Sequence, residues 1–326
     1  MQYSKKYQRF NKQKTLCIKK DILATLAYFD MFDYPLKKRE LFIFLQQPAE
    51  NREFETAIDF LLNESIIYKL NEFYSLTNNF LLVERRFNGN ARAEALLKKA
   101  NAGAKLLSKF PYVRGVAISG SLSKNFADET ADVDFFIITA ENRLWIARSF
   151  LHIFKKFTFL FNKQHMYCMN YFIDETEPGI VEKNIYTATE IATLLPLYGS
   201  DTFEKFYSAN DWTKAYLPNH YMRISSAKQI KAHWFKFIVE KIFNNAVGNL
   251  FDNFLMKLTA KSWASKTRRR KKNSRGILMA LDTSKHFAKP NPLNFQQKLL
   301  KRYENRLAEI FDNYENIFPV TVERIK

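Results

Sequence analysis

The chain has 326 residues, of which 47% are hydrophobic and 16% aromatic, so it is long enough for two or three domains with cores of their own. Its two cysteines, Cys17 and Cys168, lie far apart in sequence, which excludes a disulfide-rich secreted scaffold. No run of about 18 apolar residues is present, and the basic N-terminus lacks the apolar segment of a secretion signal, so we expect a cytoplasmic protein without a transmembrane segment.

The formal net charge of +18 belongs to the two ends of the chain. Residues 1–20, a basic tail, contain seven Lys or Arg and no acid, and residues 225–326 contain 21 Lys or Arg against eight Asp or Glu. The densest run, Lys266 to Lys272 followed by Arg275, repels itself and should therefore be exposed. It could meet nucleic acid, an anionic membrane surface or a polyanionic substrate, or it could be a solvated basic loop.

After the basic tail, residues 21–83 read as three short helices and a hairpin. Helical patterns cover residues 22–32, 36–46 and 52–63. Apolar residues on both sides of Asn71 and Glu72 predict two short strands, and this order of elements resembles a winged helix-turn-helix module. The expected third helix has one base against four acids between Arg52 and Glu64. Phosphates would repel it, which favours a packing or protein-contact module over a DNA reader.

The most informative segment runs from Val116 to Thr139 and reads VAISGSLSKNFADETADVDFFIIT. Gly120 follows an apolar strand, and a glycine there permits a tight turn and a close approach of backbone to ligand. If a helix begins over residues 122–126, its backbone N–H groups would face a phosphate, and the Ser121 hydroxyl could add a donor.

Two aspartates open the second strand of this segment. Because side chains alternate along a strand, Asp132 and Asp134 should project to the same face while Val133 points away. Two carboxylates so close repel each other unless a cation lies between them. Mg²⁺ prefers one or two carboxylates together with phosphate oxygens and water, so the pair is a candidate magnesium site.

The arrangement resembles the polymerase β-like nucleotidyltransferase superfamily, whose signature is a Gly-Ser turn, about ten residues, and Asp-x-Asp before an apolar strand. The resemblance implies two-metal attack on the α-phosphate of a nucleoside triphosphate, with pyrophosphate leaving. It implies that Asp132 and Asp134 are catalytic and ligate Mg²⁺. The nucleotide-binding residues that it implies are Gly120, Ser121, Ser123 and Lys124.

The superfamily pattern also has a third carboxylate on a later strand. The next apolar strand, expected over residues 166–173, contains no acid, and Asn170 lies where one is expected. An amide cannot accept a proton at neutral pH, so base catalysis would come from elsewhere or be absent. Asp174 and Glu175 follow the strand and are candidate substitutes, although a solvated turn before Pro178 and Gly179 explains them better.

The other expected elements are helices over residues 84–110, 143–161, 187–195, 229–264 and 299–311. We therefore predict an α+β protein with a small mixed nucleotidyltransferase sheet flanked by helices at residues 84–220. The winged-helix-like module precedes this core, and a basic helical region, residues 221–326, follows it. Over residues 20–217 the chain also resembles a group of bacterial nucleotidyltransferase-domain proteins, which supports this order.

The favoured function is a Mg²⁺-dependent transferase that moves a nucleoside monophosphate, AMP first, to a hydroxyl on a small molecule, a protein or an RNA end. The alternative is a catalytically weak or inactive nucleotide-binding or nucleic-acid-associated regulatory protein that has lost the third acid. A transcriptional regulator acting through the N-terminal module is a third hypothesis. Pyrophosphate release separates the first hypothesis from the other two.

Overall fold

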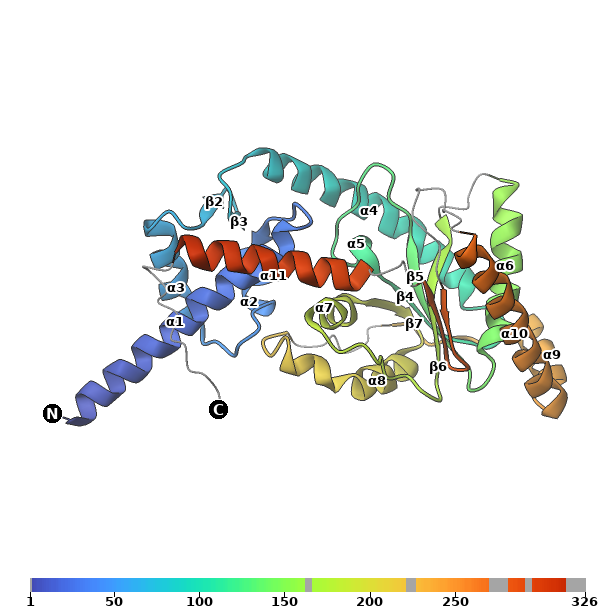
Figure 1. Ribbon diagram of the computed structural model, residues 1–326. Helices are drawn as coiled ribbons and strands as arrows, with labels where there is room; N and C mark the ends of the chain where they lie inside the picture. Colours follow the sequence, from blue (N-terminus) through green and yellow to red (C-terminus); the bar gives the residue numbers. More distant parts are fainter. Residues whose placement is uncertain (1, 162–165, 221–226, 270–280, 291–294, 315–326) are drawn as a thin grey trace.

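The computed structural model describes residues 2–161, 166–220, 227–269, 281–290 and 295–314 (Figure 1). Within these ranges the chain is an α+β protein with a three-stranded sheet near the N-terminus and a six-stranded central sheet. Residues 270–272 and Arg275 of the predicted basic run lie outside the described residues.

The N-terminal part follows the predicted order of helices and hairpin. Its elements are α1 (Gln2–Asp30), β1 (Leu36–Lys37), α2 (Lys38–Ile43), α3 (Asn51–Asn63), β2 (Tyr68–Leu70) and β3 (Phe73–Ser75). The antiparallel sheet has the order β1-β3-β2, and the pairing of Leu36 with Tyr74 makes a strand where a helix was expected. Residues 2–20, set apart above as a basic tail, belong to the same helix as residues 21–30.

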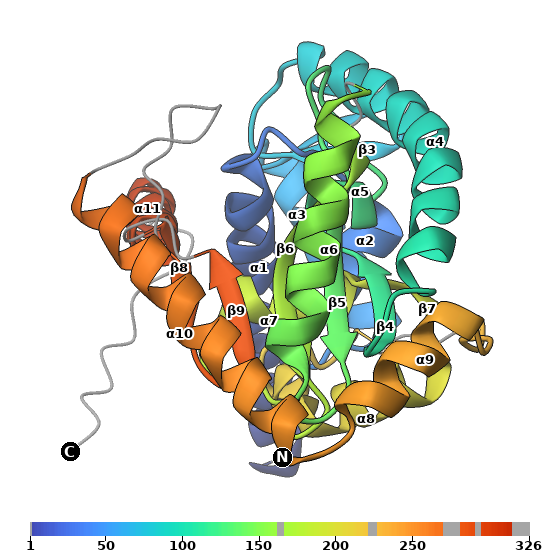
Figure 2. The same ribbon diagram turned by 90° about the vertical axis from the view of Figure 1, so that its right-hand side faces the viewer.

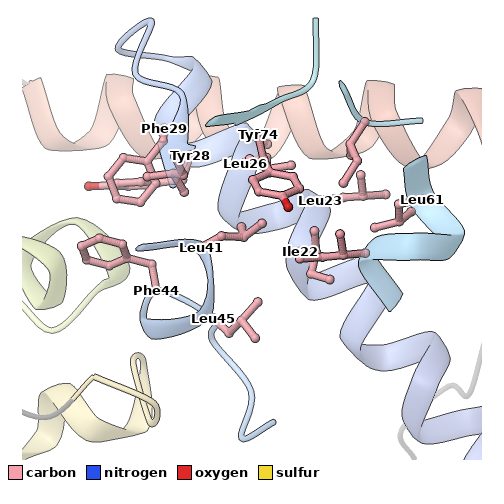
Figure 3. Close-up of a cluster of buried hydrophobic side chains, with 14 of the residues drawn as sticks. Ile22, Leu23, Leu26, Tyr28, Phe29, Leu41, Phe44, Leu45, Leu61 and Tyr74 are labelled. Carbon is pink, nitrogen blue, oxygen red and sulfur yellow. The ribbon is translucent and has the colours of Figure 1, made fainter. Parts of the chain in front are cut away.

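One side of α1 forms the core of this part (Figure 3). Ile22 and Leu23 are adjacent, Leu26 lies about one turn further along the helix, and all three are buried. Around them pack Leu41 of α2 and Leu61 of α3, together with Tyr74 of β3. Each fully buried side chain of this size contributes about 1.5–3 kcal/mol, so these contacts explain why three short elements fold on α1.

The central sheet is mixed, as predicted. Its strands are β4 (Val113–Ile118), β5 (Asp134–Thr139), β6 (Cys168–Asp174), β7 (Leu195–Tyr198), β8 (Leu281–Thr283) and β9 (Phe287–Pro290). They have the order β7-β4-β5-β6-β9-β8, and all neighbours are antiparallel except β5 and β6. The helices of the same region are α4 (Leu81–Leu107), α5 (Gly120–Ser123), α6 (Leu144–Phe159), α7 (Ile185–Thr193), α8 (Ser200–Ala209) and a 3-10 turn (Asp211–Ala215).

Helices cover both faces of this sheet. Phe135 and Ile137 of β5 point to one face, where they pack with α4 and α6. Phe136 and Ile138 point to the other face, where they pack with α7 and α8. This alternation is why a continuous apolar run can serve as a strand buried on both sides.

The C-terminal region differs from the mostly helical one predicted. It contains α9 (Trp234–Phe243), α10 (Ala246–Arg268) and α11 (Phe295–Asn313), but β8 and β9 extend the central sheet. The single helix expected over 229–264 is interrupted because the Asn245 side chain accepts a hydrogen bond from Gly248 N (3.0 Å) and starts α10. None of the helices in the described ranges is both long and apolar enough to cross a bilayer.

A buried arginine joins the N-terminal part to the central sheet. Arg86 of α4 is only 2% exposed, and its guanidinium donates to Glu40 Oε1 (2.7 Å) and Pro35 O (3.0 Å). It also lies 3.6 Å from the centre of the Tyr34 ring. The Tyr34 hydroxyl donates to Lys124 O (2.6 Å), so this contact reaches the glycine-serine turn.

We predict that Arg86→Met lowers the free energy of unfolding by about 2–3 kcal/mol, because Glu40 and the Pro35 carbonyl lose a charged donor in a buried place. Denaturant unfolding measures the change. Arg92→Met on the same helix is the matched control: Arg92 pairs with Glu129 at the exposed surface, and its loss should cost at most about 0.5 kcal/mol. Equal effects of the two substitutions would contradict the prediction.

Candidate functional site

The structure brings the glycine-serine turn against Asp134. Gly120 has a φ of +70°, a left-handed conformation that side chains disfavour. A Cβ atom at this position would lie 3.1 Å from Asp134 Oδ2. Ser119 N donates to Asp134 O (2.9 Å), which ties the turn to the first residue of β5. Both the backbone conformation and the carboxylate beside it therefore favour glycine at this position.

Asp132 and Asp134 lie near the same sulfur atom. Asp134 begins β5, so its side chain projects to the α7 face, like Phe136. Asp132 precedes the strand rather than lying in it, although Cys168 N still donates to Val133 O (3.1 Å). The pKa of Cys168 is raised to about 11, mainly by burial and in part by both carboxylates and a hydrogen bond to Asp134.

The residues predicted to bind nucleotide have different roles. Ser121 is exposed, whereas Ser123 is buried and its hydroxyl donates to Gly120 O (2.8 Å). Lys124 Nζ donates to Gly120 O (3.1 Å) and to Glu190 Oε1 (2.8 Å). Ser123 therefore stabilises the turn through its buried hydroxyl. Lys124 lies beside the turn, where Glu190 pairs with its charge.

The helix expected over residues 122–126 is a single turn that covers the sequence GSLS. It ends at Lys124 because Asn125 adopts a φ of +58° and reverses the chain. A single turn has little of the dipole of a longer helix, so any phosphate affinity must come from local N–H groups and from the side chains around the turn.

The turn lines a cavity of about 420 Å³, within the range of ligand pockets, roughly 300–1,000 Å³. Gly120, Ser121 and Lys124 form one wall, and the other charged residues of the lining are Arg85, Asp33, Asp128 and Glu190. The apolar walls are aromatic side chains from α1, α7, α11 and neighbouring loops: Tyr28, Phe29, Phe32, Tyr34, Phe126, Tyr186 and Phe295. The cavity thus lies between the N-terminal part and the central sheet.

Two residues of α7 belong to this site, and the sequence reasoning did not select either. Tyr186 and Glu190 are four residues apart and face the cavity together. Burial raises the pKa of Tyr186 well above its usual range, and the charges of Glu190 and Asp134 raise it further, so its hydroxyl stays protonated. The i, i+4 spacing of a tyrosine and an acid was the available signal, but nothing in the sequence indicated which strand this helix covers.

Asp174 is not near the turn. It pairs with Thr139, at the opposite end of β5 from Asp134. It is fully buried, and its carboxylate accepts from Thr176 N (3.0 Å) and Asn142 N (3.2 Å) and contacts His286 Nδ1 (2.9 Å). These contacts make it a structural acid at the end of β6, so Asp174 does not supply a third acid to this site.

Asn170 and Glu175 were the other residues considered for the position of the third acid. Asn170 lies in β6 between Met169, paired with Phe135, and Tyr171, paired with Phe136; its side chain is outside the described part of the chain. Glu175 N donates to Thr139 O (3.1 Å), so Glu175 lies with Asp174 at the far end of the sheet. Glu190 is an acid that the structure does place beside the turn.

No family model, curated protein or solved structure matches the chain. Within the described ranges, no group of three or more His, Cys, Asp or Glu is arranged to hold a metal ion. Mg²⁺ nevertheless needs only one or two protein carboxylates when a substrate phosphate and water complete its shell. Asp132 and Asp134, with the gap that Gly120 leaves beside Asp134 Oδ2, have the donor chemistry for such a shared site.

We expect Gly120→Ala to lower the free energy of unfolding by about 1–2 kcal/mol, because alanine is strained at a positive φ. The new methyl group would also press on Asp134 Oδ2. Gly179→Ala is the control, since its Cβ would meet only Ala209 O, at 3.8 Å. Thermal or denaturant unfolding of both variants tests the difference. A Gly120→Ala protein as stable as wild type would contradict it.

The raised pKa of Cys168 predicts slow alkylation at neutral pH, where little thiolate is present, and a rate that rises until the pH approaches about 11. In a Cys17→Ser background, so that only Cys168 reacts, Asp134→Asn should lower this pKa and speed alkylation at a fixed pH. Iodoacetamide labelling followed by mass spectrometry measures the rate. Asp128→Asn, an exposed acid paired with Arg85 (2.9 Å), should leave the rate unchanged. Equal rates in all three proteins would contradict the placement of Asp134 beside the Cys168 thiol.

Proposed function

We propose that the protein is a Mg²⁺-dependent nucleotidyltransferase that transfers a nucleoside monophosphate, AMP first, from a nucleoside triphosphate to a hydroxyl acceptor. The observation that carries this proposal is that Gly120, which lines the aromatic cavity, lies so close to Asp134 that a Cβ atom on it would be 3.1 Å from Asp134 Oδ2. A backbone turn able to accept phosphate and a carboxylate able to share a cation are what this chemistry needs in one place.

The roles follow from the positions of the side chains. The Gly120-Ser121 turn would hold the triphosphate through backbone N–H groups and the exposed Ser121 hydroxyl. Asp132 and Asp134 would hold Mg²⁺ together with phosphate oxygens. When bound, the ion neutralises the phosphate charge and lowers the pKa of an attacking hydroxyl. The aromatic walls would exclude water from the reacting groups.

Glu190 is the acid that we propose in place of Asp174. Its ion pair with Lys124 (2.8 Å) would be exchanged when Lys124 turns to the triphosphate. The released carboxylate could then accept the acceptor's proton as its oxygen bonds to the α-phosphorus, while the bond to the β-phosphate breaks and pyrophosphate leaves. This assignment uses a residue already in the cavity.

The order of elements in the N-terminal part supports a winged-helix-like module, and its contacts favour packing over DNA reading. Helix α3 packs on α1 through Phe54, Ile58 and Leu61. Asp59 and Glu64 lie on its exposed side, where DNA phosphates would repel them. We therefore propose that this module forms part of the catalytic cavity.

Pyrophosphate release from a panel of nucleoside triphosphates and hydroxyl acceptors tests the proposal. We expect Mg²⁺-dependent release that Asp132→Asn and Asp134→Asn each reduce at least about 100-fold, because each removes a carboxylate that would hold the ion against the transferring phosphate. Glu129→Gln, a surface acid paired with Arg92, should keep the wild-type rate.

Calorimetry with Mg²⁺ and a non-hydrolysable triphosphate separates binding from turnover. Binding without pyrophosphate release in wild type would favour a nucleotide-binding regulatory protein. Neither binding nor release, or release that is unaffected by both aspartate substitutions, would contradict the proposed site.

A further inference from the structure

Helices α9 and α10 carry a row of large apolar side chains that the other described residues of the chain leave exposed. On α9 these are Trp234, Phe237 and Ile242, and on α10 they are Val247, Leu250 and Phe254. Trp234 is 70% exposed and Leu250 is 71% exposed. The spacing within each helix places its three residues on one side. We call these six residues the apolar face.

Buried polar contacts hold the opposite sides of both helices. On α9, Lys236 Nζ donates to Val113 O (2.5 Å), and Glu240 pairs with Arg114 (2.9 Å). On α10, Asp252 accepts from Ile146 N (2.8 Å). These contacts fix which side of each helix points inward. The apolar face, on the opposite side, therefore points toward solvent. Both helices lie at the end of the molecule remote from α1 (Figures 1 and 2).

The exposed charges of these two helices are all positive. Glu240 and Asp252 are their only acids, and both are engaged on the inner side. The exposed cations are Lys241, Lys257, Lys261 and Arg268. An outward apolar surface flanked by cations alone is the composition of segments that lie in the interface of an anionic bilayer.

We propose that the apolar face docks on an anionic lipid bilayer, with α9 and α10 lying in the plane of the interface. A second copy of the chain is disfavoured, because a symmetric contact through this face would bring the cations of the two copies together. Nucleic acid is disfavoured because its affinity comes mainly from phosphate contacts, which the six apolar side chains cannot make. The positive charges and the exposed apolar area together fit an anionic lipid bilayer.

Co-sedimentation of the full-length protein with vesicles tests this surface. We expect binding to vesicles of phosphatidylcholine with phosphatidylglycerol, and weaker binding to phosphatidylcholine alone. Replacing Trp234, Leu250 and Phe254 together by serine should reduce the partition coefficient at least about tenfold, since each side chain loses apolar area buried in the membrane. The matched control replaces Phe80, Leu81 and Val181, which are exposed elsewhere, by serine and should bind like wild type.

A second variant tests the charges without touching the apolar face. Replacing Lys241, Lys257 and Lys261 by glutamine should weaken binding to the anionic vesicles by about fivefold per residue and flatten its salt dependence. Asp134→Asn should bind vesicles like wild type, so this result is independent of the proposed catalysis. Circular dichroism and the melting temperature verify that each variant is folded.

The proposal is overturned if wild type does not bind the anionic vesicles, or if the two serine variants lose binding equally. It is also overturned if light scattering shows a dimer that the Trp234, Leu250 and Phe254 replacement disperses. Binding of an oligonucleotide that displaces the vesicles and is unaffected by that replacement would equally assign the surface to nucleic acid.

Discussion

The buried guanidinium of Arg86 is the contact on which the arrangement of the site depends. It joins α4 to Glu40 and to the Pro35 carbonyl, and its plane packs on the Tyr34 ring. Tyr34 in turn holds the carbonyl of Lys124 at the end of the glycine-serine turn. A charge buried in this way is stable only when every partner is in place, so the N-terminal part and the turn are held in one relative position.

This connection gives the cavity its walls. α1 and the loop after it contribute aromatic side chains, α7 contributes Tyr186 and Glu190, and the turn contributes backbone. Phe126 reinforces the same junction, because its ring lies where any side chain at Gly89 would have to be. The N-terminal module is therefore part of the site in a physical sense, and its acidic third helix fits a packing role better than a role in reading DNA.

The local sequence predicted β4, β5, β6 and the turn well, because their signals are local. The run from Phe135 to Ile138 could only be buried on both sides, and Gly120 marked the reversal before it. Asp174, one of the candidates for a third acid, lies at the other end of the sheet, because sequence proximity to a strand end does not say which end faces the turn. Glu190 reaches the site only through the packing of α7 on the sheet, which no short-range pattern encodes.

Three strands of the central sheet, β7, β8 and β9, were not predicted because their sequence signals are weak. β7 contains Pro196, which is tolerated because this strand lies at the sheet edge, and β8 and β9 have only three and four residues.

The positions of β9 and α11 in the chain have a consequence for biosynthesis. When the ribosome has finished the glycine-serine turn, it has not yet made β9, which pairs with β6, or α11, which packs on α1. The part of α1 that packs against Tyr303 and Ile310 of α11 therefore stays without this partner until the end of translation, whereas α2, α3 and β3 can cover the rest of α1 much earlier.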